Sequence, residues 1–489
     1  VECGMDSVAA IEFSRALLKK MHFPLPVTLV YDYTSIIDIE RYILGMMNRN
    51  NVEVHKKSFK MHPKSDKSNI LASWSQKTNR ETSNDLITKT LKFGRVIPET
   101  PYSGHEIDKV STIQPFVVII SNIFAFDSQA FHITEMECSS IDPQHRILLE
   151  VVQNARAQAS MLLSQSGKDG VIVGISSNEF CQISTMVPKS LKATGGFLSV
   201  ACGRISYVYN FTGPSMCIDT ACSSSLVSLH LSNRTLTKLL IRIFSGGVNI
   251  TLLQSTSSMF ASAGMLSSDG RCKVLDALAD GYVRSEECII ALLANFQEKD
   301  HIVIEVKGSA VSQDGRSSSL TAPNGPSQKD CINMAIADIS EKVEVLEFFT
   351  FDLLQLHGTG TALGDPIEFG ALHGLNNVTS KNEPLVVSAS KSRSGHKEPA
   401  SGLFGLVNAI EQCKNSTTQA MFHLTFLSRH IAPYLCTGGN IEEGKAWCIH
   451  RQKCSNLSSK ANKNMNAGTS AFAFQGTNSH IITSTFENS

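Results

Sequence analysis

The stretch Ile218–His230, IDTACSSSLVSLH, joins the end of a short strand to the start of a helix. Thr212–Gly213–Pro214 is a turn signal, and Met216–Ile218 is apolar enough for a buried strand. Ser223–Ser225 and the apolar residues after it predict a capped helix start. Cys222 therefore lies at a strand-to-helix turn, where backbone N–H groups and the positive helix end can lower a cysteine pKa from about 8.5 to roughly 3.5–7.5. Two interpretations stay open for this stretch alone: a reactive nucleophile, or a cysteine packed as a small hydrophobe.

Length and composition limit the classes of protein to which the chain can belong. Its 489 residues correspond to about three ordinary domains, or to one large domain with an appendage. A 42% hydrophobic and 18% charged composition allows a sizeable buried core. Basic and acidic residues number 44 each, so the chain has no net charge to attract nucleic acid or an anionic membrane. No apolar run approaches the roughly 18 residues of a membrane span. We expect no nucleic-acid partner and no membrane span.

The cysteines and the first residues bear on the location of the protein. Thirteen cysteines, an odd number without zinc-finger or disulfide-scaffold spacing, favour a reducing compartment. We expect an intracellular, cytoplasmic protein, and a plastid location stays open. The chain opens with VECGMDS, which contains neither an initiator methionine nor a signal-like segment, and this indicates a piece of a longer protein.

The region after the first 90 residues has the pattern of an α/β fold. Short apolar runs alternate with helix-like stretches, and several runs are followed by Gly, Ser, Thr or Asp, as at strand-to-helix joints. The expected strands lie at Val171–Ile175, Cys217–Ile218, Phe244–Asn249, Ile289–Leu293, Ile302–Val306, Leu353–Leu356 and Leu385–Ala389.

Three clusters downstream of Cys222 carry candidate chemistry. His357 opens a Gly/Thr loop directly after an apolar run, and Lys391–His396 follows another such run. Phe472–Asn478 is a tight turn of small residues whose N–H groups can face a ligand. Each cluster alone is compatible with a structural histidine or an ordinary turn. Together with a cysteine they match acyl-thioester chemistry, which needs a soft nucleophile, neutral imidazoles that donate to an oxyanion, and N–H groups for a tetrahedral intermediate.

Seven segments, in the same order, resemble the β-ketoacyl synthase (ketosynthase) domain of type I polyketide synthases. The resemblance covers roughly residues 91–483 and implies a thiolase-like fold of two similar α/β halves in five layers (αβαβα), usually in a homodimer. The segments are IDPQHRILLE (141–150), CGRISYVYNFTGPSMCIDTACSSSLVSLH (202–230), MLSSDGRCKVLDALADGYVRSE (265–286), KGSAVSQDGRSSSLTAPNGPSQ (307–328), HGTGTALGDPIEFGAL (357–372), KSRSGHKEPASGLFGLVNAI (391–410) and FAFQGTNSHIIT (472–483).

The resemblance also implies the residues of the reaction centre. Cys222 would be the nucleophile that accepts the acyl group. His357 and His396 would bind the extender thioester carbonyl and assist decarboxylation, and both should stay neutral and packed among apolar groups. Lys391 would support the network around the two histidines.

Further implied roles concern the oxyanion and the incoming substrate. The backbone N–H groups of Cys222 and Phe474 would form the oxyanion hole, and Thr359 and Thr361 would hydrogen-bond the phosphopantetheine arm. The implied reaction is a decarboxylative Claisen condensation by an acyltransferase of the β-ketoacyl-[acyl carrier protein] synthase type. It needs no metal and no NAD(P). The implied partners are acyl carrier domains with their acyl and malonyl thioesters, and other synthase domains in cis or in trans.

The first residues are similar to the second half of an acyl carrier domain. Spacing alone predicts only a fragment of a small helical bundle in GMDSVAAIEFSRALL and FPLPVTLVYDYTSIIDIERYIL. The resemblance implies that 4′-phosphopantetheine is attached to Ser7 in the intact protein. The predicted domains are a partial carrier (1–47), a polar linker (48–90), a ketosynthase N-terminal half with the nucleophile (91–305) and a C-terminal half with the two histidines (306–489).

The sequence departs from the family pattern at several places. The opening apolar strand of the family is not recognisable between residues 51 and 114, and we expect this polar stretch to supply no central strand. Arg393 is expected beside His396, where a cation would disfavour protonation and crowd the pocket. The other replacements are Gln355 for glutamate, Ser285 and Glu287 for glycines, Ser394, Ala473 and Gln475.

These departures leave more than one function open. The first hypothesis is an active ketosynthase. The second is a catalytically impaired ketosynthase-like domain that acts as a dimerisation and carrier-docking scaffold. A cysteine hydrolase is a third and disfavoured hypothesis, because no acidic partner accompanies a histidine. The sequence leaves acyl chain length, extender unit, final product and the presence of an acyltransferase in cis open.

Overall fold

A computed structural model describes most of the chain after residue 125 and short pieces before it. The described residues are 68–75, 117–118, 120, 123, 125–160, 168–183, 189–236, 242–295, 304–340, 349–375, 385–432, 447–449 and 464–485. The chain divides into two units, Val1–Lys64 and Ser65–Ser489, and the description below concerns the second. The predicted carrier segment and Ser7 lie outside the described residues.

Eleven strands in the described part form one hydrogen-bonded sheet, in the order β11-β10-β9-β12-β13-β8-β1-β7-β5-β3-β4. A separate pair joins β2 (Val117–Val118) to β6 (Arg284–Ser285). The strands of the large sheet are β1 (Ser68–Ser75), β3 (Gly170–Gly174), β4 (Ser215–Ile218), β5 (Arg242–Asn249), β7 (Glu287–Asn295), β8 (Ile304–Gln313), β9 (Leu353–Gln355), β10 (Leu385–Ser388), β11 (Trp447–Ile449), β12 (Asn466–Phe472) and β13 (Thr477–Thr485). Each of the seven predicted strands overlaps one of these.

The sheet consists of two halves with the same plan. In the first half β4, β3 and β5 are parallel and β7 is antiparallel to β5. In the second half β11, β10, β9 and β12 are parallel, and β13 is antiparallel to β12. Parallel strands buried on both faces read as continuous apolar runs, which explains why the sequence indicated them.

Strand β1 corrects one expectation. The stretch 48–90 was expected to provide only a polar linker and no central strand, yet Ser68–Ser75 forms a strand in the middle of the sheet. It pairs along its length with β7 and through Asn69 and Ile70 with β8. Hydrogen bonds on both edges stabilise such a strand without requiring an apolar run, so the polar composition was a poor guide.

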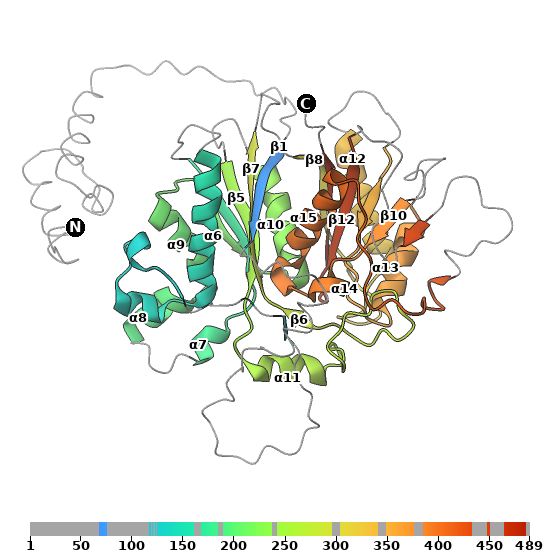
Figure 1. Ribbon diagram of the computed structural model, residues 1–489, viewed down its shortest axis with the longest axis horizontal. Coiled ribbons are helices and arrows are strands. Elements are labelled where there is room, and N and C mark those ends of the chain that lie inside the picture. Colours follow the sequence, from blue (N-terminus) through green and yellow to red (C-terminus); the bar gives the residue numbers. More distant parts are fainter. Residues whose placement is uncertain are drawn as a thin grey trace, which may run out of the picture. The chain divides into compact units, whose positions relative to one another are not determined.

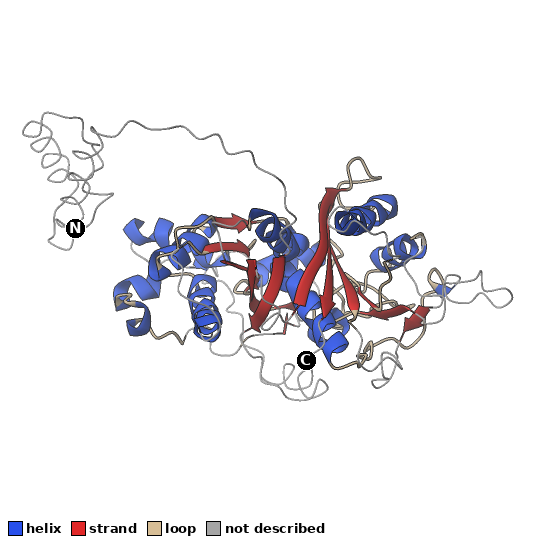
Figure 2. Cartoon of the chain, turned by 90° about the horizontal axis from the view of Figure 1, so that it is seen from above, coloured by secondary structure: helices blue, strands red, loops and turns tan. Residues whose placement is uncertain are grey.

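Helices separate and cover the two halves (Figure 1). On the outer side of the first half α6 (Pro143–Ser160) and α9 (Leu198–Tyr209) lie on β7, β5 and β4, and on its inner side α10 (Ser224–Thr235) lies on β3 and β5. α10 contacts α15 (Ser401–Lys414), which lies on β12. Beyond the second half α12 (Gly325–Ser340) covers β8 and β13, and α13 (Gly364–His373) packs beside α12. The five layers of the predicted thiolase-like fold are therefore present, and Figure 2 shows helices on both sides of the strands.

The buried core follows these layers. One cluster lies between α6, α9 and the first half of the sheet, and another lies between the second half and α12. A third lies in the central layer, where Leu226 and Leu229 of α10 meet Leu403 and Leu406 of α15. The shorter helices are α5 (Glu135–Ser140), α7 (Glu179–Ile183), α8 (Lys189–Gly196), α11 (Gln254–Ser262) and α14 (Lys391–Ser394). Among the described helices, none has the length and apolarity that a membrane crossing requires.

Candidate active site

Cys222 lies where the sequence analysis predicted, between β4 and α10. A short 3₁₀ turn, Ala221–Ser223, leads into the helix. Ala221 has a φ of 51°, a left-handed conformation that costs a non-glycine residue roughly 1–2 kcal/mol. The predicted serine cap is wrong, because the Ser223 hydroxyl donates to the Thr220 carbonyl (3.0 Å) and the Ser224 hydroxyl to the Ala221 carbonyl (2.7 Å). These bonds brace the strained turn.

The Cys222 sulfur faces a histidine and two backbone donors. His396 Nε2 lies 3.0 Å from Sγ, and the N–H groups of Phe474 and of Cys222 itself point at the sulfur. Burial nevertheless raises the pKa of the thiol to about 12, with a smaller contribution from the Glu398 carboxylate. The expectation of a lowered pKa is therefore wrong, since burial outweighs the helix end and the backbone donors.

His357 and His396 lie side by side in this buried site. Their rings are perpendicular with centroids 5.7 Å apart, and the Tyr282 ring meets His396 edge-on at 4.8 Å. Burial holds the pKa of both histidines well below 6.5, and the Lys391 charge lowers both further. Both imidazoles are consequently neutral near pH 7, in agreement with the sequence analysis.

Lys391, at the start of α14, supports His357. Its Nζ donates to the His357 carbonyl at 2.6 Å and lies 3.5 Å from His357 Nδ1. A lysine proton donated to Nδ1 would leave the ring's own proton on Nε2. Nε2 can then donate a hydrogen bond to a substrate oxygen.

Two carboxylates on α13 hold the loop that carries His357, and the sequence analysis missed both. Glu368 accepts from the N–H groups of His357 (2.7 Å) and Gly358 (2.8 Å). Asp365 accepts from the Gly360 N–H at 3.1 Å. Burial raises the pKa of Glu368 to about 7 and that of Asp365 to about 6. The available signal was the spacing of two acids three residues apart, one helical turn beyond the Gly/Thr loop.

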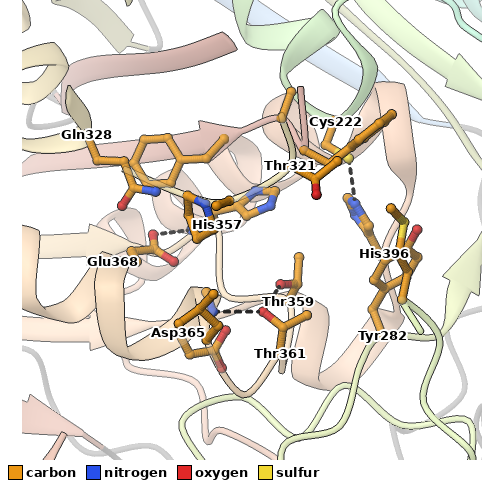
Figure 3. A pocket seen from close by; sticks show the side chains of 18 of the residues that line it. Cys222, Tyr282, Thr321, Gln328, His357, Thr359, Thr361, Asp365, Glu368 and His396 are labelled. Atoms are coloured by element: carbon orange, nitrogen blue, oxygen red, sulfur yellow. Dashed lines mark hydrogen bonds between the residues drawn. The ribbon is translucent and has the colours of Figure 1, made fainter. Parts of the chain in front are cut away.

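These groups border a cavity of about 270 Å³ (Figure 3). Apolar groups, among them Met265, Tyr282 and Leu363, share its lining with polar ones. The hydroxyls of Thr359 and Thr361 lie 3.3 Å apart in it. No group of three or more His, Cys, Asp or Glu residues in the described ranges has an arrangement that could hold a metal ion. The predicted residues that line the cavity are Cys222, His357, His396, Thr359, Thr361 and Phe474.

The replacements Arg393, Gln355 and Gln475 do not obstruct this cavity. Arg393 was expected to crowd it, but its guanidinium lies 5.5 Å from the centre of the Phe422 ring, and neither residue is among those that line the cavity. Gln355 is buried and donates to the Ser390 hydroxyl at 3.1 Å. Gln475 accepts from the Thr477 N–H at 2.7 Å within the turn that carries Phe474.

Comparisons with known proteins agree with this geometry. Family models match the β-ketoacyl synthase N-terminal domain over residues 77–298, its C-terminal domain over 303–425 and a phosphopantetheine attachment site over 1–43. The attachment domain indicates phosphopantetheine as the cofactor. Attachment to Ser7, the role of each site residue and the predicted domain boundaries stay predictions.

Two curated relatives are polyketide synthase proteins. A phenolphthiocerol/phthiocerol polyketide synthase protein of Mycobacterium tuberculosis is 33% identical over 73% of this chain and 16% of its own length. Spectinabilin polyketide synthase system protein NorA' of Streptomyces orinoci is 29% identical over 98% of this chain and 13% of its own length. The chain therefore spans less than a fifth of either relative.

Solved structures lead to the same family. The ketosynthase from module 6 of the bacillaene synthase of Bacillus subtilis aligns with a TM-score of 0.69 at 28% identity, over 86% of this chain and 72% of that one. An oxazolomycin ketosynthase domain of Streptomyces albus aligns with a TM-score of 0.65 at 26% identity, over 76% and 65%. The chain belongs to the β-ketoacyl synthase family, as a ketosynthase of the polyketide synthase type with a phosphopantetheine attachment domain before it.

Proposed function

We propose that this chain catalyses a decarboxylative Claisen condensation between an acyl group on Cys222 and a malonyl-type thioester on an acyl carrier domain. One observation carries the proposal: a neutral thiol lies 3.0 Å from a neutral imidazole, and a second neutral imidazole lies beside the first. A reaction that passes through an enolate needs uncharged donors next to a nucleophile that can also leave.

The first step loads the enzyme. The Cys222 proton moves to His396 Nε2 as the sulfur attacks the carrier-bound thioester carbonyl. The N–H groups of Cys222 and Phe474 point to this sulfur and would stabilise the tetrahedral oxyanion. The carrier thiolate leaves and takes the proton back from His396. Because the resting thiol is neutral, no thiolate has to be maintained in the buried site between turnovers.

The second step forms the carbon–carbon bond. The bond between the carboxylate carbon and the α-carbon of the malonyl group breaks, CO₂ leaves, and the electron pair becomes an enolate. His357 would donate its Nε2–H group to the enolate oxygen, and His396 would join it as the tautomer that carries its proton on Nε2. The α-carbon then bonds to the acyl carbonyl, the bond to the Cys222 sulfur breaks, and the thiolate takes one proton from solvent. The product is a 3-oxoacyl thioester.

The cavity suits the phosphopantetheine arm, whose thiol carries the acyl group. The arm contains two amides that require hydrogen-bond partners in a buried channel. Gln328 Oε1 and Asn478 Oδ1 are buried in the cavity lining and have no partner among the described residues. They can accept from amide N–H groups, and the hydroxyls of Thr359 and Thr361 can donate to amide carbonyls. Acyl carrier domains are accordingly the proposed partners, and the homodimer expected from the family resemblance stays a prediction.

Intact-protein mass spectrometry tests the proposal. The chain is incubated with a short acyl-pantetheine thioester and weighed, with Cys222→Ala as the matched control. We expect a mass gain of one acyl group that the Cys222→Ala variant lacks. Addition of malonyl-pantetheine thioester should then remove the acyl group and release a 3-oxo product.

The two stages of this experiment separate the candidate functions. Absence of a Cys222-dependent mass gain would overturn the catalytic proposal and favour the non-catalytic scaffold. Mass gain followed by free acid without a 3-oxo product would indicate a hydrolase instead.

A further inference from the structure

A buried ion pair joins Lys397, the residue after His396, to Glu287, the first residue of β7. Lys397 Nζ lies 3.3 Å from Glu287 Oε2 and 3.3 Å from the Ser285 hydroxyl, to which it donates. Lys397 and Glu287 are each only 2% exposed. The ammonium also lies 4.3 Å from the centre of the Phe404 ring. A carboxylate, a hydroxyl and an aromatic face together satisfy a cation that could not otherwise be buried.

Backbone hydrogen bonds tie His396 to the stretch Val283–Ser285, which contains β6 and precedes β7. The His396 N–H donates to the Val283 carbonyl at 2.7 Å, and the Ser285 N–H donates to the His396 carbonyl at 2.8 Å. Gly395 lies so close to this stretch that a Cβ would come within 3.1 Å of the Ser285 Cβ. The side chains of Lys397 and Glu287 therefore bridge two segments that are already in register.

The position of the His396 ring depends on these contacts, because the ring itself makes few others. Nε2 faces the Cys222 sulfur, and Nδ1 is buried without a partner among the described residues. A ligating or catalytic imidazole is ordinarily oriented by a bond at the second nitrogen. With none here, the ring orientation follows from the backbone and from the edge contacts with Tyr282 and His357.

We propose that Lys397 and Glu287, with Ser285, are positioning residues that hold His396 against Cys222. Glu287 and Ser285 stand where the family resemblance places glycines, so the replacements that looked like damage in the sequence supply two of the three members. The proposal rests on the proposed function for its catalytic consequence, but the contact between His396 and Cys222 can be tested without turnover.

A double-mutant cycle on the full chain tests it, with Lys397→Met, Glu287→Gln and the double variant. The first readout is the rate at which iodoacetamide alkylates Cys222 between pH 7 and 10, followed by peptide mass. The second is the condensation rate divided into kcat and KM. Folding is checked by circular dichroism at the same temperature.

We expect each single variant to slow alkylation at pH 8 by about tenfold and to lower kcat by about 10- to 100-fold with KM nearly unchanged, because misplacement of the general base affects the chemical step. The double variant should resemble the single variants, since both residues act as one unit. The matched control is Arg242→Met, which breaks the buried pair with Asp169 (2.6 Å) where β5 and β3 begin, away from Gly174 and the nucleophile turn. This control should lose stability and keep the alkylation profile.

Each outcome decides the proposal. Unchanged alkylation and kcat in folded single variants, or strictly additive losses, would overturn it. Should Lys397→Met not fold, Ser285→Ala removes only the hydroxyl acceptor and is expected to slow alkylation a few-fold, and no slowing there would equally overturn it. If the chain proves unable to condense substrates, the alkylation cycle still reports on the contact between His396 and Cys222.

Discussion

At the scale of the residue, burial decides the protonation state of the nucleophile. The pKa of Cys222 is raised to about 12, so the reactive thiolate is a minor species near pH 7. We predict that the alkylation rate of Cys222 by iodoacetamide rises about tenfold per pH unit from pH 7 to 10 without a plateau. Free cysteine is the control, because its rate levels off above its pKa of about 8.5. A plateau for Cys222 below pH 8 would show that the thiol is instead activated at rest.

Glu368 supplies a second residue-scale prediction. Its carboxylate accepts from two consecutive N–H groups, those of His357 and Gly358. At pH 8.5, above the Glu368 pKa of about 7, Glu368→Gln replaces one oxygen of a charged carboxylate by an NH₂ group that faces a donor. Hydrogen bonds to charged groups contribute about 1.5–3 kcal/mol. We expect the condensation rate to fall by about 10- to 100-fold while acyl loading on Cys222 persists. Mass spectrometry of loading beside a product assay separates the two steps, and equal losses in both would contradict a role confined to His357.

Much of the candidate site could be predicted from the sequence, because Cys222, His357 and His396 each follow an apolar run in a recognisable motif. The sequence could not give the thiol pKa, since the burial arises from segments far along the chain, such as those of Tyr282 and Phe474. Arg393 was misplaced for a related reason. Its direction depends on the first turn of α14 and on Phe422, neither of which the local sequence indicates.

At the scale of the element, the contact between β3 and α10 positions the nucleophile turn. Gly174 ends β3, and a Cβ there would lie 2.7 Å from the Ser224 Cβ at the helix start. We predict that Gly174→Ala displaces this helix end, costs about 1–3 kcal/mol of stability and slows acylation of Cys222. Thermal unfolding and the loading assay measure the two effects.

Gly203 provides the matched control for that substitution. It lies within α9, and a Cβ there would meet nothing within 4 Å. Gly203→Ala should leave loading unchanged and raise stability by up to about 1 kcal/mol, because alanine is the better helix former. Equal behaviour of the two variants would contradict a specific contact at Gly174.

Strands were predicted correctly where their own sequence is a continuous apolar run. The run Val171–Ile175 is apolar at nearly every position, as a strand buried on both faces requires, and β3 is buried along its length. β1 carries no such signal, because its place follows from free hydrogen-bonding edges on β7 and β8. The position of such a strand is determined by its neighbours in the sheet and cannot be predicted from its own sequence.

At the scale of the whole molecule, β1 makes one sheet out of two halves. It lies between β7 and β8, which do not pair with each other in the described sheet. Removal of β1 would leave backbone donors and acceptors of both strands unsatisfied in a buried layer, at about 1–3 kcal/mol for each group.

We predict that deletion of residues 1–64 preserves a cooperative thermal transition and acyl loading, whereas deletion of residues 1–76 abolishes both. Ile70→Pro in the full chain is the finer test, because Ile70 is in register with β7 and β8 at once and proline removes the backbone donor of a central strand. If the longer deletion and Ile70→Pro both melt like the shorter deletion, β1 does not join the halves in solution.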